Sequence, residues 1–258
     1  MYPFLHIGNL KLPMYSAMIV LGTVIAFFMA SYDCKRKKLS RKYLLALAST
    51  SLFVSFIGAK ILYFIVTYKP NEILNIFKEG NWLWIISGGY VFYGGFVFGI
   101  LTFLVMSKIL HCKMSEYANV LVKAIPLAYA FGRIGCFCAG CCYGMPSDSI
   151  LGVVFENPIG LAPVGVKLFP IQLFECVFNL LLTILLWWID LKCSKKNILV
   201  PLYFLTYSVE RFVIEFFRYD LERGIYCGLS TSQWISAAFF IAGLVLLIFR
   251  GKSENKKL

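Results

Sequence analysis

The stretch FGRIGCFCAGCCYG, residues 131–144, places Arg133 at the end of an apolar run and follows it with a loop rich in glycine and cysteine. A charged side chain at bilayer depth costs roughly 2.5–3.5 kcal/mol on membrane-insertion scales. Such a residue is retained where it meets an anionic partner or a water-filled cavity. Arg133 is therefore a candidate functional residue, provided that the run before it crosses a membrane.

The composition of the whole chain indicates a membrane protein. Of its 258 residues, 60% are hydrophobic and 17% are aromatic, and the mean hydropathy is +0.77, which is too apolar for a soluble domain. Seven apolar runs each approach the ~20 residues that cross roughly 30 Å of hydrocarbon. They cover residues 15–32, 43–68, 91–110, 117–135, 169–191, 198–217 and 233–249. We therefore predict an all-α fold, a polytopic helical bundle with seven transmembrane helices in a single integral-membrane domain, residues 1–258.

The lysines and arginines predict the orientation of this bundle. They gather between the first and second, the third and fourth, and the fifth and sixth runs, and again after the seventh. Under the positive-inside rule the N-terminus is then outside and the C-terminus is cytoplasmic, with outer segments at about 69–90 and 136–168. This topology accounts for most of the net charge of +12, so we expect no nucleic-acid partner. Residues 1–13 lack the features of a cleaved signal peptide and should form irregular backbone that is retained.

Two groups of polar residues lie inside the predicted spans. Gln172 and Glu175 stand three residues apart, on one face of a helix. A second set follows one helical face at i, i+4, i+8 and i+11, and consists of Tyr207, Arg211, Glu215 and Arg218. In one interpretation, arginine and glutamate form an ion pair that lets a polar helix end persist in lipid. In the other, which two separate intramembrane arginines favour, one arginine is held by carboxylate while another binds phosphate.

Four motifs resemble those of the bacterial phosphatidylglycerol–prolipoprotein diacylglyceryl transferase family. They are GRIG at 132–135, FPIQLFE at 169–175, RFVIEFFR at 211–218 and GLSTSQ at 228–233. GAK at 58–60 and the glycine pair at 94–95 add weaker matches. The order and spacing agree along nearly the whole chain, and the family's seven spans with an outside N-terminus agree with the topology above.

The resemblance implies a reaction at the outer face of the bacterial cytoplasmic (inner) membrane. A diacylglyceryl group passes from phosphatidylglycerol to the cysteine thiol of a lipoprotein precursor, and glycerol 1-phosphate is released. The implied catalytic residues are Arg133, Arg211, Tyr93 and Glu215. The implied substrate-binding residues are Arg133, Arg211, Tyr15 and Tyr207, with Glu175 holding the arginines or the polar network. We also predict substrate binding by Gly94, Gly95, Gln172, Arg218 and Lys60. For Lys60 the alternative is that its side chain snorkels to the membrane interface. The expected partners are phosphatidylglycerol, membrane lipids and the signal peptide of the precursor, the protein is expected to be a monomer, and no metal or organic cofactor is expected.

The chain departs from the family's pattern at two places. Tyr93 stands where the family has a histidine, and tyrosine is a poor base at neutral pH. Cys136 and the segment 139–141 stand where the family has asparagine and then Asn-Gly-Glu. These departures leave an alternative open, in which a divergent paralogue transfers a glycerolipid fragment to a different acceptor.

The cysteine-rich loop has its own interpretations. Its cysteines are Cys136, Cys138, Cys141 and Cys142. They could form a disulfide facing an oxidising exterior, act as redox-active or acyl-accepting thiols, or pack as small apolar residues. A metal site of four thiolates fits the ligand type, but the spacing is unusual for zinc and adjacent cysteines rarely share one ion. A membrane thiol-redox protein that uses this loop is thus a further alternative function.

Overall fold

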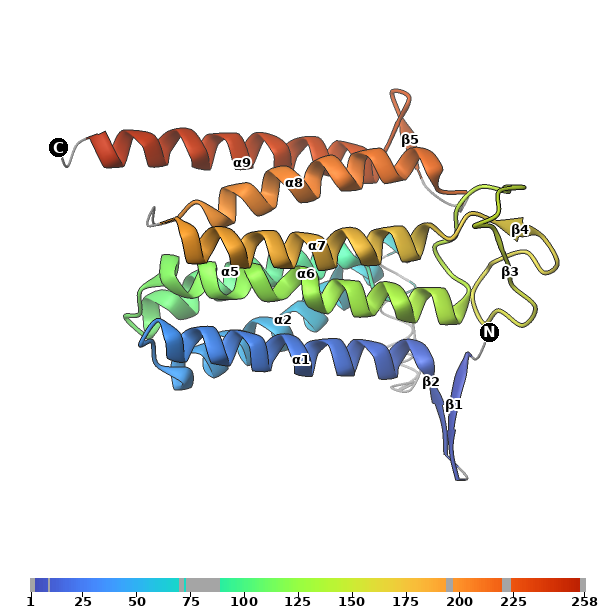
Figure 1. Cartoon of the computed structure of the whole chain (residues 1–258), viewed down its shortest axis with the longest axis horizontal. Coiled ribbons are helices and arrows are strands. Elements are labelled where there is room, and N and C mark those ends of the chain that lie inside the picture. The colour runs from blue at the N-terminus through green and yellow to red at the C-terminus, as the bar shows by residue number, and fades with distance from the viewer. Residues whose placement is uncertain are drawn as a thin grey trace. The chain divides into compact units, whose positions relative to one another are not determined.

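The computed structural model describes residues 3–8, 10–69, 72, 89–193, 197–219 and 224–255. Within these residues the chain forms one long helix for each of the seven predicted runs (Figure 1). The helices are α1 (Met14–Arg36), α2 (Arg41–Thr67), α5 (Phe92–Ile109), α6 (Met114–Ala139), α7 (Ile171–Lys192), α8 (Leu199–Ile214) and α9 (Thr231–Asn255). The predicted outer segment at 69–90 lies almost wholly outside the described residues. The chain divides into two compact units, residues 1–33 with 118–258, and residues 34–117.

The first unit contains α1 and the four helices from α6 to α9. Gly22 of α1 lies against α6, because a Cβ added there would stand 2.4 Å from Cβ of Phe131. The rings of Tyr32 on α1 and Trp187 on α7 stack with centroids 6.2 Å apart. Helices α8 and α9 pack along each other, and a Cβ at Gly243 would meet Leu205 at 3.0 Å. Leu182, Leu186 and Leu199 form part of the apolar core between α7 and α8.

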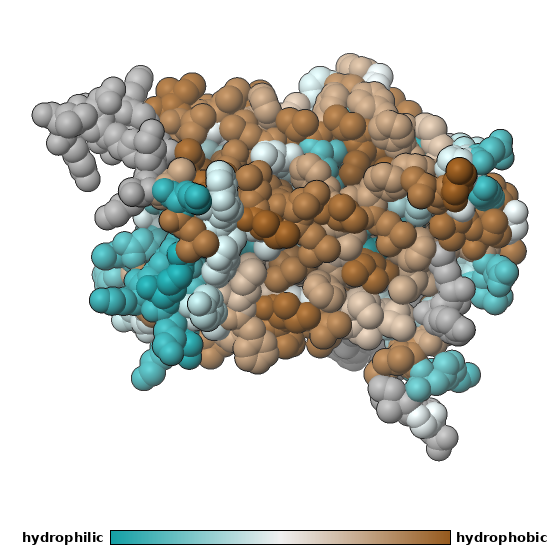
Figure 2. All heavy atoms as spheres, viewed as in Figure 1, coloured by the Kyte–Doolittle hydropathy of each residue, from teal (hydrophilic) through white to brown (hydrophobic). Residues whose placement is uncertain are grey.

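The outer surfaces of these helices are apolar, as lipid contact requires. Large exposed hydrophobic side chains include Leu181, Ile184, Val213 and Phe249. In Figure 2, hydrophobic side chains cover the middle of α7, α8 and α9. Five described helices are long and apolar enough to cross a membrane, namely α1, α2, α6, α7 and α9. The chain is therefore a polytopic helical membrane protein.

The second unit is built on the close approach of α2 and α5. A Cβ at Gly94 would stand 2.3 Å from the carbonyl oxygen of Gly58, and one at Gly95 would stand 2.9 Å from that of Ser55. Small residues let two membrane helices bring their backbones together. The paired glycines thus allow α5 to pack closely on α2.

Three pairs of antiparallel strands lie outside the helices in the described part of the chain. Strands β1 (Phe4–Ile7) and β2 (Leu10–Pro13) pair antiparallel before α1, so the prediction of irregular backbone at the N-terminus was wrong. Strands β3 (Val153–Val154) and β4 (Lys167–Leu168) pair within the loop after α6. Strands β5 (Ile225–Tyr226) and β6 (Leu229–Ser230) pair just before α9.

A buried ion cluster joins three helices of the first unit. The Lys123 ammonium of α6 lies 2.5 Å from Oδ2 of Asp33 on α1 and 2.6 Å from Oδ2 of Asp190 on α7. It also lies 4.8 Å from the centre of the Trp187 ring. Lys123 is completely buried, and its two carboxylate partners offset the cost of removing that charge from water.

Candidate active site

Arg133 is held by two side chains in the first unit. Its Nη2 lies 2.5 Å from Oε2 of Glu175, a fully buried carboxylate on α7. The hydroxyl of Tyr129, one helical turn earlier on α6, accepts hydrogen bonds from Nε at 3.0 Å and from Nη2. That hydroxyl donates in turn to Oε2 of Glu175 at 2.8 Å. The predicted anionic partner of Arg133 is therefore Glu175, and the geometry fixes the plane of the guanidinium.

Arg211 is held along one edge only. Its Nη2 lies 2.8 Å from Oε2 of Glu215, one turn later, and donates to Oγ of Ser232 on α9 at 3.1 Å. Its Nη1 is buried and has no hydrogen-bond partner among the described residues. Buried nitrogens of a guanidinium are normally satisfied, because an unmade hydrogen bond is costly. The predicted pairing of Arg211 with Glu215 is present, and one nitrogen remains available for an anion.

Tyr207 connects the two arginines. Its ring meets the Tyr129 ring edge to face with centroids 5.9 Å apart, and it lies within electrostatic range of both Arg133 and Arg211. Arg211 is likewise within electrostatic range of Tyr129 and Glu175. The two guanidinium groups therefore belong to one polar cluster inside the helices of the first unit.

An apolar trough opens beside this cluster. It has a volume of about 590 Å³ and is lined by residues of α7, α8 and α9, including Phe174, Phe178, Val209 and Phe240. Its one carboxylate is Glu210, whose two oxygens are buried with no hydrogen-bond partner in the described chain. An apolar trough next to cationic groups is complementary to a phospholipid, whose acyl chains are apolar and whose headgroup carries a negative phosphate.

The cysteine-rich segment is folded by the end of α6. Helix α6 runs to Ala139, so Cys136 and Cys138 lie in its last turns and the predicted outer segment begins later than residue 136. Gly140 has φ +71°, a left-handed conformation that glycine adopts without strain. The amide of Cys141 then donates to the carbonyl of Cys136 at 3.1 Å, and that of Gly140 to Phe137 at 3.3 Å. This is a Schellman motif, and it reverses the chain over the helix end.

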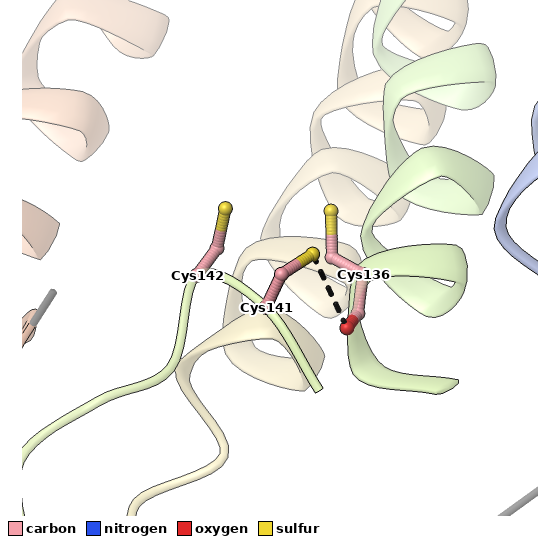
Figure 3. Close-up of side chains that lie close together, drawn as sticks. All are labelled: Cys136, Cys141 and Cys142. Atoms are coloured by element: carbon pink, nitrogen blue, oxygen red, sulfur yellow. Dashed lines mark hydrogen bonds between the residues drawn. The ribbon is translucent and has the colours of Figure 1, made fainter. Parts of the chain in front are cut away.

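The reversal brings three thiols together. The Sγ atoms of Cys136, Cys141 and Cys142 all lie within 4.8 Å of one another. Figure 3 shows the sulfurs of Cys136 and Cys142 pointing to the same side, with Cys141 beside them and directed at the carbonyl oxygen of Cys136. Cys138 is not part of this cluster. All nine cysteines are free thiols in the structure, and the disulfide and redox interpretations stay predictions.

The thiol cluster lies next to the polar cluster. Gln172, fully buried in the first turn of α7, donates to the carbonyl of Cys141 at 2.8 Å. Tyr15, in the first turn of α1, lies within electrostatic range of the three clustered cysteines and of Arg133. Hydrogen bonds from the Cys136 and Cys141 thiols lower the pKa of Cys142, and the charges of Arg218 and Arg133 act in the same direction. Hydrogen bonding to Cys136 and Cys142 raises the pKa of Cys141.

Arg218 is placed differently from the prediction. Helix α8 ends at Ile214 and is followed by a 3-10 turn, η1 (Glu215–Phe217), so Arg218 does not continue the helical face of Arg211. It lies instead in extended backbone that bridges to Gly144 of the cysteine-rich segment. Its side chain is buried and lies within electrostatic range of the Cys142 thiol.

The remaining predicted residues belong to the second unit. Lys60 of α2 donates to the carbonyl of Gly89 at 3.4 Å, and its ammonium lies 4.7 Å from the centre of the Tyr90 ring. Tyr93 is the second residue of α5, directly before the glycines that pack on α2. The roles proposed for Lys60, Tyr93, Gly94 and Gly95 stay predictions.

Sequence reasoning missed two residues of the polar cluster, Tyr129 and Glu210. The spacing of Tyr129 and Arg133, one turn apart on one helix, was a signal for the first contact. The sequence alone cannot show whether Glu210 is buried or lies at the lipid interface, because its burial depends on how α7, α8 and α9 pack.

The fold and this site define a class: an integral-membrane enzyme in which apolar helices enclose paired arginines and carboxylates. The family model for prolipoprotein diacylglyceryl transferase matches residues 3–249, and the chain belongs to this family of transferases. It is 34% identical over 236 residues to the phosphatidylglycerol–prolipoprotein diacylglyceryl transferase of Clostridium tetani, covering 92% of each chain. It is 35% identical over 243 residues to the protein of Clostridium perfringens named transferase 2, covering 93% of this chain and 92% of the relative. The Bordetella avium transferase is 29% identical over 259 residues, covering 98% and 96%.

Proposed function

We propose that this protein transfers the diacylglyceryl group of phosphatidylglycerol to the cysteine thiol of a lipoprotein precursor. The names of the relatives support this activity. In this chain the main support for the activity is Nη1 of Arg211, which is buried and has no hydrogen-bond partner among the described residues. The other terminal nitrogen of the same guanidinium, Nη2, is held by Glu215 and Ser232. A guanidinium so placed matches the oxygens of a phosphate.

The chemistry of the reaction needs fixed positive charge. The acceptor sulfur forms a bond to a glycerol carbon, the bond from that carbon to the phosphate oxygen breaks, and the electron pair leaves with glycerol 1-phosphate. Charge therefore grows on the phosphate in the transition state, where donors held in place stabilise it most. Arg211 would bind the phosphate through Nη1, and Arg133, held by Tyr129 and Glu175, would supply the second charge.

The apolar trough supports a lipid donor. Its lining of Phe174, Phe178, Val209 and Phe240 suits acyl chains. The lining also includes Glu210, which lies within electrostatic range of both arginines. A small soluble phosphate ester would gain nothing from such a lining. The membrane-embedded trough thus favours a phospholipid over a soluble donor.

The finer topology is part of the proposal. We place all seven helices across the bacterial inner membrane, with the N-terminus outside and the C-terminus in the cytoplasm. Helix α8 has 16 residues, about 24 Å at 1.5 Å per residue. The following turn η1 adds about 6 Å at 2.0 Å per residue, which reaches the ~30 Å of a hydrocarbon core. Reporter fusions after α1 and α2 test it, because an outside reporter after α1 would refute this orientation.

The activity is tested with the purified protein in detergent, phosphatidylglycerol and a peptide that carries a lipobox cysteine. The thioether product is followed by mass and glycerol phosphate by an enzymatic assay. Both products are expected in equal amounts. Glycerol phosphate without thioether would refute the lipoprotein acceptor and favour a paralogue with another acceptor, and the absence of both would refute the transferase activity.

A pair of variants separates the transferase from a thiol-redox protein. Arg211→Ala should abolish both products, whereas Arg41→Ala, which removes an exposed arginine at the start of α2, should retain them. A redox protein would instead keep its activity in Arg211→Ala. Equal loss in both arginine variants would contradict the proposed phosphate site.

A further inference from the structure

The three-sulfur cluster at the end of α6 is not explained by the arginine chemistry. A disulfide uses two sulfurs, yet Cys136, Cys141 and Cys142 converge with every sulfur pair within 4.8 Å. In a tetrahedral zinc site with Zn–S bonds of about 2.3 Å, neighbouring sulfurs stand about 3.8 Å apart. Small rotations of the three side chains bridge that difference. The arrangement therefore fits three ligands of one metal ion.

The backbone explains how adjacent cysteines can share an ion. Side chains of consecutive residues in extended backbone point to opposite sides. Cys142 has φ +55°, a left-handed conformation that is unusual outside glycine, and its sulfur points to the same side as that of Cys136. The conformation costs on the order of 1–2 kcal/mol, so other interactions in the fold must hold Cys142 in it. The left-handed conformation of Cys142 therefore answers the objection that adjacent cysteines rarely bind the same ion.

The electrostatic surroundings suit a thiolate site. Three thiolates with one Zn²⁺ carry a net charge of −1, which needs positive groups nearby. Arg133 and Arg218 both lie within electrostatic range of Cys142. The first turn of α7 also approaches the cluster, since Gln172 binds the carbonyl of Cys141 at 2.8 Å, and a helix N-terminus favours negative charge.

We propose that Cys136, Cys141 and Cys142 bind one Zn²⁺ ion and leave its fourth position open to the acceptor thiol. Sites with three protein ligands and one open position are typical of catalytic zinc. Cys141 and Cys142 are only half-buried, so a peptide can reach the ion. The site departs from the expectation that no metal takes part.

The use of the open position rests on the proposed function. A free thiol has a pKa near ~8.5 and is mostly protonated at neutral pH, whereas a thiol bound to zinc is deprotonated. Glu175 and Glu215 are already paired with arginines, and Glu210 lies in the lining of the apolar trough. On binding zinc the acceptor thiol releases its proton to solvent, and its sulfur then attacks the glycerol carbon while the electron pair of the broken bond leaves on the phosphate.

The metal is tested without any activity assay. The full-length protein, reduced in detergent and dialysed against excess Zn²⁺ and then against buffer, should retain about one zinc per chain. Cys136→Ser, Cys141→Ser and Cys142→Ser should each lose most of it. Cys138→Ser is the matched control, since Cys138 lies in the same helix outside the cluster, and it should keep the metal. Zinc content unchanged by the three substitutions, or equally reduced in Cys138→Ser, would overturn the proposal.

Spectroscopy of the unsubstituted protein tests the metal site without relying on variants, which could lose zinc because they fail to fold. X-ray absorption should give sulfur neighbours at about 2.3 Å from zinc, and Co²⁺ should give a thiolate-to-metal charge-transfer band. A shell of nitrogen and oxygen alone would overturn the site. Zinc removal should lower thioether formation at least tenfold, with recovery on adding Zn²⁺. A stripped protein with full transferase activity would refute the catalytic use of zinc while leaving the transferase proposal intact.

Discussion

Replacing Tyr129 with phenylalanine tests how Arg133 is positioned. The substitution removes one oxygen that accepts two hydrogen bonds from Arg133 and donates one to Glu175. The ring keeps its edge-to-face contact with Tyr207, so packing should survive. Hydrogen bonds to charged groups contribute about 1.5–3 kcal/mol. If that energy is lost in the transition state, kcat/KM should fall about 10- to 150-fold.

The assay separates positioning from binding. Initial rates of thioether formation are measured against phosphatidylglycerol concentration. Tyr129 contacts the arginine rather than the lipid, so kcat should fall while KM changes little. Tyr203→Phe is the control, because Tyr203 stacks on Tyr207 at 5.6 Å without a contact to Arg133. A Tyr129→Phe enzyme with the rate of the Tyr203→Phe enzyme, at matched melting temperature, would refute the positioning argument.

Three further substitutions test other parts of the structure. Arg211→Lys should lower kcat/KM roughly 10- to 150-fold, because one ammonium cannot hold Glu215 and a phosphate in the same geometry; activity equal to that of the unsubstituted protein would contradict the phosphate site. Gly140→Ala should lower the melting temperature more than Gly165→Ala, since both positions have positive φ but only Gly140 faces a Cβ clash, at 2.5 Å from Pro158; equal shifts would count against the packed helix end. Lys123→Met should cost about 3–5 kcal/mol of stability, because two buried carboxylates lose their counter-ion, and the melting temperature should fall well below that of the exposed-site control Lys113→Met.

The helices were predictable because lipid imposes a simple rule on sequence. Each of the seven apolar runs became one helix, since in hydrocarbon the backbone must satisfy its own hydrogen bonds. The ends were less predictable. Helix α6 passes the predicted end at residue 135 because no residue before Gly140 takes a left-handed conformation that ends it.

The site was predictable where it depends on one helix. The pairing of Arg211 with Glu215 follows from a spacing of four residues on α8. The partners of Arg133 lie on two helices, and only packing reveals that Tyr129 and Glu175 meet at the same guanidinium. The thiol cluster depends on the Schellman turn and on the strained Cys142, and neither can be deduced from the spacing of the cysteines.

The ion cluster at Lys123 has a consequence for biogenesis. Asp33 is synthesised 90 residues before Lys123, and Asp190 follows Lys123 by 67 residues. A carboxylate at a membrane helix is costly until a partner neutralises it, so α1 has no intramolecular counter-charge from this cluster until α6 has been translated. Pairing of α1 with α6 would then create the site that α7 joins last. A chain truncated before Lys123 would leave Asp33 without its Lys123 partner, and membrane quality control could distinguish such an unfinished chain from a finished one.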